Sequence, residues 1–237
     1  MAVVFSQAAL LSDFGTQPHF PSPGIGHNET LTGHSLFASC PGLLGTAFTY
    51  AKGEEIYGDD QPAEYVYEVM SGAVRTCKLL DDGRRQIGAF LLPGDVFGLE
   101  STPNHRLTAD AVIDTTVRIV RRRSLETAAQ NDIRVANALW AITARDLRHA
   151  EDHMLLLGRK TASERVAAFL LEMDRRLTVA GLIELPMCRR DIADYLGLTL
   201  ETVSRVLSQF QAEGMLGLSG ARHIALHNRQ RLRSMNI

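Results

Sequence analysis

Two charged residues near the C-terminus have the types and spacing that base reading requires. Arg205 follows Glu201 by four residues, so a helix would place both on one outward face together with Ser204. A guanidinium can donate two hydrogen bonds to guanine, and a carboxylate can accept one from the amino group of cytosine. The same carboxylate can brace the guanidinium, or the two can form an ordinary surface ion pair.

The surrounding sequence predicts a helix-turn-helix. Gly197, Leu198 and Thr199 interrupt two helical patterns. Gly197 can adopt the left-handed conformation that ends a helix, and the Thr199 hydroxyl can cap the next one. Apolar residues on both sides of the break have the spacing of buried helix faces: Ile192, Ala193, Leu196, Val203, Val206, Leu207 and Phe210.

The C-terminal part of the chain is the basic part. Residues 186–237 contain seven arginines and four acidic residues, a charge of +3, which leaves -5 for the remainder of a chain whose total is -2. Neutralisation of phosphate needs such local positive charge. The stretch from Gly214 to Leu226 predicts a glycine-turned hairpin, or wing. We expect phosphate and positioning contacts from Arg189, Arg190, Thr199, Thr202 and Arg222.

Composition excludes several other classes. With 237 residues, 45% of them hydrophobic, the chain can form one large or two modest domains, and its net charge argues against a chromatin-like protein. Three sparse cysteines without C-x-x-C spacing suit a reducing cytosol. We find no apolar run of about 18 residues. We therefore expect a cytoplasmic, non-enzymatic protein without membrane contact, metal site or cofactor.

The region before the helices predicts β structure. Residues 1–35 mix glycine, proline, serine and histidine, and we expect a loosely ordered extension. Residues 36–130 form the predicted β domain, with short alternating segments from Thr46 to Arg121 that indicate an antiparallel barrel or sandwich. Asp82-Gly83 suits a type I′ hairpin turn, in which both residues have positive φ.

A long helix is predicted for residues 131–158. Its apolar seam predicts pairing with a second copy of the helix, although this face could instead pack on the chain's own barrel. Gly158 is a candidate hinge before the DNA-binding domain, residues 159–237. The seam residues recur at heptad spacing: Ile133, Ala136, Trp140, Thr143, Leu147, Ala150, Met154 and Leu157.

These elements, in this order, resemble the CRP/FNR family of bacterial transcription regulators over about residues 40 to 230. Three stretches carry the resemblance, Pro93–Gly98, Arg165–Leu171 and Glu201–Arg205, and the C-terminal tail is similar to the FixK-type branch. The resemblance implies an α+β fold: an N-terminal β-roll, similar to cupin and cyclic-nucleotide-binding barrels, a long dimerisation helix and a C-terminal winged helix-turn-helix.

The resemblance also implies a function. A homodimer would bind double-stranded DNA at a TTGA-N6-TCAA-like palindrome, with Glu201, Ser204 and Arg205 reading bases. It would recruit RNA polymerase, mainly as an activator of microaerobic, nitrogen-fixation and denitrification genes.

Departures from the family pattern argue against an obligatory small-molecule effector. The glutamate and arginine that hold a cyclic nucleotide are displaced at Glu100 and Arg106, and a buried phosphate without a positioned guanidinium is costly. Cys40 and Cys77 cannot supply four iron-sulfur ligands. The alternative is an effector-gated regulator whose barrel binds a nucleotide, haem or another small ligand. We interpret most of the histidines as solvated loop residues.

Cys188 is the candidate redox switch. It begins the first helix of the predicted helix-turn-helix, next to Arg189 and Arg190, and both features favour the reactive thiolate. Oxidation would place bulk and negative charge against phosphate and weaken DNA binding. The alternative is an inert cysteine that serves as a small hydrophobe. Cys40 and Cys77 are interpreted as structural, Cys77 within a strand.

Overall fold

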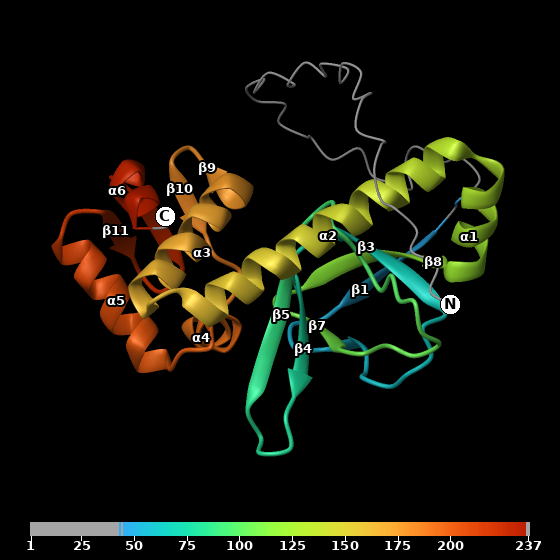
Figure 1. The fold of residues 1–237 in the computed structure, drawn as a ribbon, viewed down its shortest axis with the longest axis horizontal. Coiled ribbons are helices and arrows are strands. Elements are labelled where there is room, and N and C mark those ends of the chain that lie inside the picture. The colour runs from blue at the N-terminus through green and yellow to red at the C-terminus, as the bar shows by residue number, and fades with distance from the viewer. Residues whose placement is uncertain (1–42, 44, 236–237) are drawn as a thin grey trace, which may run out of the picture. The chain divides into compact units, whose positions relative to one another are not determined.

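The first half of the chain forms a β domain of two four-stranded antiparallel sheets. The computed structural model describes residues 43 and 45–235. The sheets have the strand orders β1-β8-β3-β6 and β2-β7-β4-β5. Figure 1 labels β1, β3, β4, β5, β7 and β8 of this domain. The strands are β1 (Thr46–Tyr50), β2 (Glu55–Tyr57), β3 (Tyr65–Ser71), β4 (Val74–Leu79), β5 (Arg85–Leu91), β6 (Val96–Phe97), β7 (Thr108–Ala111) and β8 (Thr115–Arg121).

Strand β3 is buried on both faces. One face contributes Tyr67 to a cluster with Tyr57 and Phe97 inside the barrel. The other face contributes Val66, which packs in a cluster with Leu125 and Val135 of the helices that follow the barrel. This double burial explains why apolar or aromatic residues occur in both alternating sets of β3, at Tyr67 and Val69 on one face and at Val66 on the other.

The hairpin between β4 and β5 does not use the predicted type I′ turn. Gly83 has a φ of 81°, but Asp82 is not among the described non-glycine residues with positive φ. The Gly83 amide donates to the Leu80 carbonyl at 2.9 Å, and the Leu80 amide donates to the Arg84 carbonyl at 2.8 Å. This is a longer loop in which one left-handed glycine suffices, so the aspartate avoids an unfavourable backbone conformation.

Two helices follow the barrel. Helix α1 spans Arg122–Asn131 and helix α2 spans Ile133–Arg159. Asp132 separates them and caps α2 by accepting a hydrogen bond from the Arg134 amide. Within the described ranges, no helix combines the length and the hydropathy that crossing a lipid bilayer requires.

The predicted break at Gly158 is wrong by two residues. Gly158 lies within α2, and the chain leaves the helix at Lys160, which is extended with φ -89° and ψ 145°. Helix α3 (Ala162–Leu177) then begins with a capping box, in which Thr161 and Glu164 bond to each other's backbone amides. That box gives α3 a start signal of its own, so the break lies at Lys160 and the glycine stays helical.

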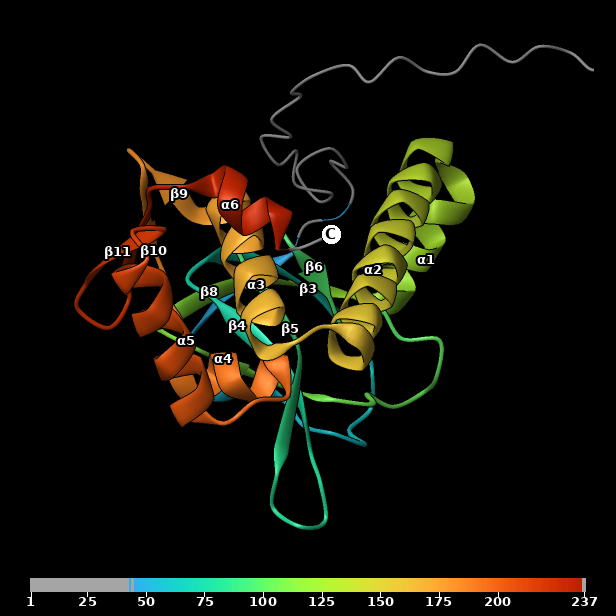
Figure 2. The same cartoon turned by 60° about the vertical axis from the view of Figure 1, so that its left-hand side comes forward.

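The C-terminal domain has the predicted helix-turn-helix and hairpin. Figure 2 shows α3, α4 and α5 grouped together. A four-stranded sheet of order β11-β12-β10-β9 contains the β11–β12 hairpin that was predicted as the wing. The remaining elements are β9 (Thr178–Val179), β10 (Leu182–Glu184), α4 (Arg189–Leu196), α5 (Leu200–Ala212), β11 (Leu216–Ser219), β12 (His223–Leu226) and α6 (Arg229–Ser234).

Candidate DNA-binding surface

Local backbone geometry sets the angle between α4 and α5. Gly197 ends α4 in the left-handed conformation, with φ 61° and ψ 40°. The Leu198 amide donates to the Ala193 carbonyl at 3.0 Å, and the Thr199 hydroxyl accepts from the Thr202 amide at 3.2 Å. All seven apolar residues predicted for the inner faces are buried. The helix-turn-helix prediction is therefore confirmed, both in the turn and in the core.

Burial of the inner face leaves the predicted base-reading residues on the outer face of α5. Glu201 and Arg205 are exposed and Ser204 is half-buried. The predicted brace between Glu201 and Arg205 is not formed; instead, the Arg205 guanidinium approaches the Thr202 hydroxyl at 3.4 Å. Arg205 therefore carries no ion pair that DNA would have to break, among the contacts of the described residues.

Glu201 is held in its charged form. Its own backbone amide, the Thr199 hydroxyl and the positive charge of Arg190 hold the pKa of Glu201 below its ordinary value. Arg190 of α4, rather than Arg205, is thus the cation that stabilises this carboxylate. A charged glutamate is the form that accepts a hydrogen bond from a base.

The residues predicted to contact phosphate differ in exposure. Arg190 is exposed, whereas Arg189 is half-buried and its Nε atom is buried without a hydrogen-bond partner. Arg222 is half-buried at the turn of the β11–β12 hairpin. Thr199 is exposed and Thr202 is half-buried, and each has its hydroxyl in the cap of α5.

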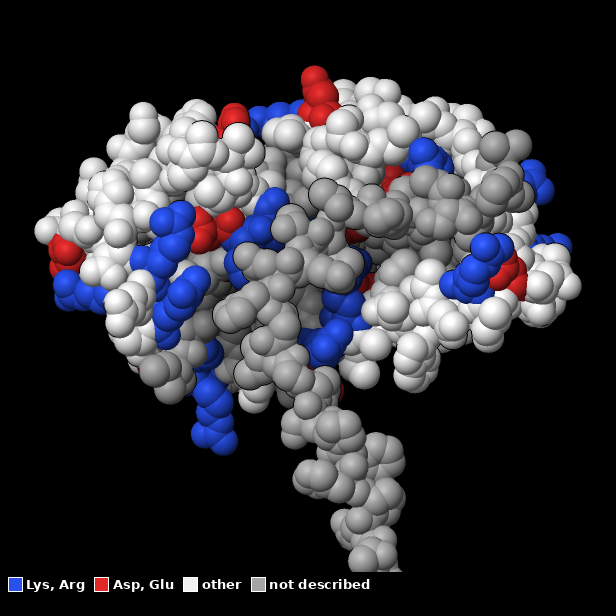
Figure 3. Space-filling model, turned by 90° about the horizontal axis from the view of Figure 1, so that it is seen from above, with Lys and Arg blue, Asp and Glu red and all other residues white. Residues whose placement is uncertain are grey.

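Other arginines of the C-terminal domain are paired internally. The Arg229 guanidinium bonds to Asp174 at 2.7 Å, and Arg231 bonds to Glu213 at 2.7 Å. Figure 3 shows one face of the molecule on which blue and red side chains lie next to one another in several places. The charge available to DNA is therefore smaller than the arginine count indicates.

Asp191 connects the barrel to the first helix of the helix-turn-helix. Its Oδ1 atom accepts hydrogen bonds from Arg75 of β4 at 2.7 Å and from Arg85 of β5 at 2.6 Å. Arg85 also bonds to Asp194 at 2.7 Å. Since arginines of the barrel neutralise both acidic residues of α4, the outer surface of this helix is more positively charged than the sequence of the helix alone indicates.

The pKa of Asp191 reflects this network. Burial by itself raises it, but hydrogen bonds from Cys188 and the cations Arg75 and Arg85 hold it below its ordinary value of 3.8. The carboxylate is therefore charged at neutral pH.

Cys188 is the N-cap residue of α4 and is exposed. Its thiol donates to the Asp191 Oδ2 atom at 3.1 Å, and its amide donates to the same atom at 3.2 Å. The sequence indicated only the cations around this sulfur, and the structure adds a carboxylate. A cavity of about 150 Å³ adjoins Cys188 and Asp191 and is also lined by Lys52, Arg75 and Arg222.

The other two cysteines have different outcomes. Cys77 lies in strand β4, as predicted, and it is buried. Cys40 lies outside the described residues.

The positions expected to hold a cyclic nucleotide are arranged differently in this barrel. The Arg106 side chain is 78% exposed and lies 3.4 Å from Glu100. His105, in contrast, is buried and stacks on Tyr57 with ring centroids 3.6 Å apart, so it is an exception to the expectation that most of the histidines are solvated loop residues. Among the described residues, no group of three or more potential ligand side chains is placed to hold a metal ion.

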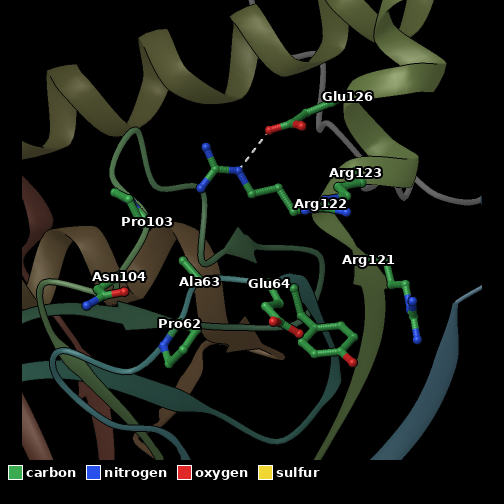
Figure 4. Close-up of a pocket in the computed structure, with 10 residues that line it drawn as sticks. Pro62, Ala63, Glu64, Pro103, Asn104, Arg121, Arg122, Arg123 and Glu126 are labelled. Carbon is green, nitrogen blue, oxygen red and sulfur yellow. Dashed lines mark hydrogen bonds and ion pairs between the residues drawn. The ribbon is translucent and has the colours of Figure 1, made fainter.

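A larger cavity, of about 510 Å³, lies where β8 passes into α1. Figure 4 shows Arg122 directed toward Glu126, to which it bonds at 2.9 Å, while Arg121 lies on the opposite side of the strand. Arg122 also donates to the Thr102 carbonyl at 3.0 Å. The Arg122 guanidinium, which lines this cavity, is thus already engaged by protein groups.

Comparisons with known proteins match both parts of the chain. The model of the cyclic nucleotide-binding domain matches residues 47–132, and that of the Crp-like helix-turn-helix domain matches residues 164–235. The chain is 48% identical over 198 residues to the nitrogen fixation regulation protein FixK of Azorhizobium caulinodans, covering 81% of this chain and 80% of that protein. It is 41% identical to FixK of Rhizobium meliloti, covering 79% and 85%.

A solved structure provides a further match. FixK2 from Bradyrhizobium japonicum aligns with a TM-score of 0.80 and 71% sequence identity, covering 82% of this chain and 98% of that one.

The Asp191 network predicts a pH-dependent contribution to stability. A carboxylate whose pKa is lowered by folding stabilises the protein above its ordinary pKa, and the contribution is lost as pH falls through the lower, folded-state value. Asp191→Asn should therefore reduce the free energy of unfolding by about 1–3 kcal/mol at pH 7, and by less below pH 3.8. Denaturant unfolding of the wild type and of Asp191→Asn, at pH 7 and below pH 3.8, measures this difference in the free energy of unfolding.

Asp152→Asn, which changes an exposed carboxylate of α2, is the control and should have little effect at either pH. An Asp191→Asn protein with the same loss of stability at both pH values would contradict the charge-based account.

Proposed function

The chain belongs to the CRP/FNR family of transcription regulators and is similar to FixK, and we propose that it acts as a homodimer on a TTGA-N6-TCAA-like palindrome. DNA binding through the helix-turn-helix, and regulation rather than catalysis, are the activities of the family. The observation that carries the finer proposal is the single outer face of α5 on which Glu201, Ser204 and Arg205 lie. Arg205 would read guanine and Glu201 would accept from cytosine.

The exposed face of α2 supports a homodimer. Val135, Ala138, Leu139 and Ile142 pack toward the barrel, so the opposite side carries the predicted seam. The large apolar side chains on that side are more than half exposed: Ile133, Trp140, Leu147 and Met154. Leu157 differs because it packs against the hydrophobic cluster that the barrel and the C-terminal domain share. An apolar stripe of this kind on a long helix fits a second copy of the same helix.

Two observations support activity without an obligatory effector. Arg106 is directed to solvent and Glu100, so it is not placed to neutralise a phosphate inside the barrel. The barrel interior is occupied by packed aromatic rings, among them Tyr57, Tyr67 and Phe97. The effector-gated alternative predicts that purified protein needs an added nucleotide, haem or other small ligand before it binds DNA.

Similarity to proteins named as nitrogen fixation regulators supports the proposed physiological role. We place the chain among activators that recruit RNA polymerase to microaerobic and nitrogen-fixation genes. In this arrangement the phosphate contacts come from Arg189, Arg190, Thr199, Thr202 and Arg222, and they set the register without reading sequence.

Oxidation of Cys188 is the proposed inhibitory signal. Each equivalent of peroxide transfers one oxygen atom to the sulfur and leaves as water, giving first sulfenic and then sulfinic acid. The added negative charge would lie at the start of α4, between the cations Arg189 and Arg190 and the DNA backbone. It would also lie beside Asp191, which is 3.1 Å from the sulfur.

A charged residue in the seam should dissociate the dimer. Leu147→Glu places a carboxylate in the apolar face, so the mass in light scattering should fall from about twice 26.1 kDa to 26.1 kDa. Asp152→Lys, on the side of α2 away from the heptad seam, is the control and should remain dimeric. A Leu147→Glu protein that is still dimeric would show that the subunits meet elsewhere.

Arg205 and Arg190 should affect DNA binding in different ways. Arg205→Ala should cost about 1–3 kcal/mol per half-site and relax the preference for guanine. Arg190→Ala should weaken all sequences alike and lower the slope of log affinity against log salt by about one. Gel-shift titrations on operator variants measure both effects, and identical profiles for the two proteins would refute this division of roles.

Peroxide should inhibit DNA binding only when Cys188 is present. Wild-type protein should lose operator binding on treatment, whereas Cys188→Ala and Cys188→Ser should keep it. Cys188→Asp, which introduces a negative charge at the same position, should bind weakly before any treatment. Inhibition of Cys188→Ala at the wild-type rate would eliminate this cysteine as the sensor.

A further inference from the structure

One guanidinium connects three segments at the junction between α2 and the helix-turn-helix. Arg165, in the first half of α3, donates from Nη2 to the Leu157 carbonyl at 2.8 Å and from Nε to the Lys160 carbonyl at 2.9 Å. Its Nη1 atom donates to the Leu196 carbonyl at 2.9 Å. These carbonyls belong to α2, to the residue that ends it, and to the last residue of α4.

The carbonyls that Arg165 binds are those a helix leaves without internal partners. The last turn of a helix exposes unpaired carbonyl groups and carries the negative end of the helix dipole. Arg165 therefore provides both hydrogen bonds and positive charge to the C-terminal ends of two helices at once. Its planar guanidinium can do this because it holds several donors in fixed directions, which a lysine ammonium does not.

Packing at the same place is close. A Cβ atom on Gly197 would lie 3.3 Å from Leu157 and 3.5 Å from the Arg165 guanidinium. His153 adds a second link, since its Nε2 atom lies 2.8 Å from the Tyr195 carbonyl and its ring stacks on Tyr195. The end of α2 and the turn of the helix-turn-helix thus form one packed joint.

We propose that Arg165 is a positioning residue that fixes the angle between the dimer helix and the reading helix, and thereby the spacing between DNA half-sites. The inference rests on the homodimer and palindrome proposed above. In such a dimer α2 sets the two-fold axis and α5 enters the groove, so the joint between them determines where the second α5 lies. Arg165 does not itself read bases in this proposal, because its guanidinium hydrogen bonds go to backbone carbonyls of its own chain.

Half-site spacing is a sensitive measure of this angle. One added base pair moves a half-site by about 3.4 Å along the DNA and rotates it by about 35°. A rigid joint discriminates strongly against such a change, and a looser joint tolerates it. A residue that only stabilises the fold would weaken binding to all spacings by the same factor.

The protein should fold without this side chain. Helix α3 keeps its capping box between Thr161 and Glu164 and its buried residues, which include Val166 and Phe169. We therefore use Arg165→Gln, which removes the charge, and Arg165→Lys, which keeps the charge but not the fork. Arg159→Gln, at the exposed end of α2, is the matched control.

The experiment measures the affinity of each full-length protein for TTGAT-Nx-ATCAA duplexes with x of 3, 4, 5 and 6. A further duplex with x of 4, in which the half-site guanine is replaced, measures the guanine preference. We expect the wild type and Arg159→Gln to prefer x of 4 by about tenfold or more, since one mismatch typically has this effect. Arg165→Gln and Arg165→Lys should reduce this spacing preference at least threefold, with the guanine preference and the salt slope unchanged.

Several outcomes would overturn the inference. The first is an unchanged spacing preference with uniformly weaker binding. The second is a slope of log affinity against log salt that falls by about one, since this identifies a phosphate contact. The third is failure of both Arg165 variants to fold. If the wild type bound none of these duplexes, the proposed operator would be rejected first and the inference with it. Wild-type spacing selectivity that persists in Arg165→Gln would reject the inference alone.

Discussion

The carboxylate of Asp191 is the interaction on which the arrangement of the DNA-binding helices depends. A buried charge is unfavourable unless its partners replace the lost water, and here two guanidiniums, a thiol and a backbone amide do so. The guanidiniums come from β4 and β5, and the other donors come from the start of α4. The Asp191 carboxylate therefore fixes both the start of α4 and the position of α4 against the barrel. The outer face of α5 then follows from α4 through the Gly197 turn.

The helix-turn-helix could be predicted from the sequence because its determinants are local. Gly197, Thr199 and the buried faces of two short helices act within a few residues of one another, and the structure has each where the pattern indicated. The Asp191 network could not be predicted, since Arg75 is 116 positions away. Arg165 was noted only as part of the Arg165–Leu171 stretch, and its contacts could not be predicted because it binds backbone carbonyls, which every residue has. The prediction at Gly158 was wrong because a helix tolerates an isolated glycine, while the Lys160 cap and the α3 capping box set the position of the break.

The barrel illustrates the difference between a fold and its ligand chemistry. Residues 47–132 match the cyclic nucleotide-binding domain, yet Glu100 and Arg106 pair with each other and the arginine is largely exposed. Tyr57, stacked on His105, occupies part of the interior. Periodicity predicted the strands correctly but not the fate of His105, because burial of a single polar ring depends on strands that are distant in sequence.

The ion pairs between the barrel and α4 make the charges of the two domains complementary. Asp191 and Asp194 are compensated only by Arg75 and Arg85 of the other domain, among the contacts of the described residues. A chimera that joined this C-terminal domain to a barrel without those arginines would carry two uncompensated negative charges in the first helix of its helix-turn-helix. Shuffling of domains between related regulators is therefore constrained: the four positions must be inherited together.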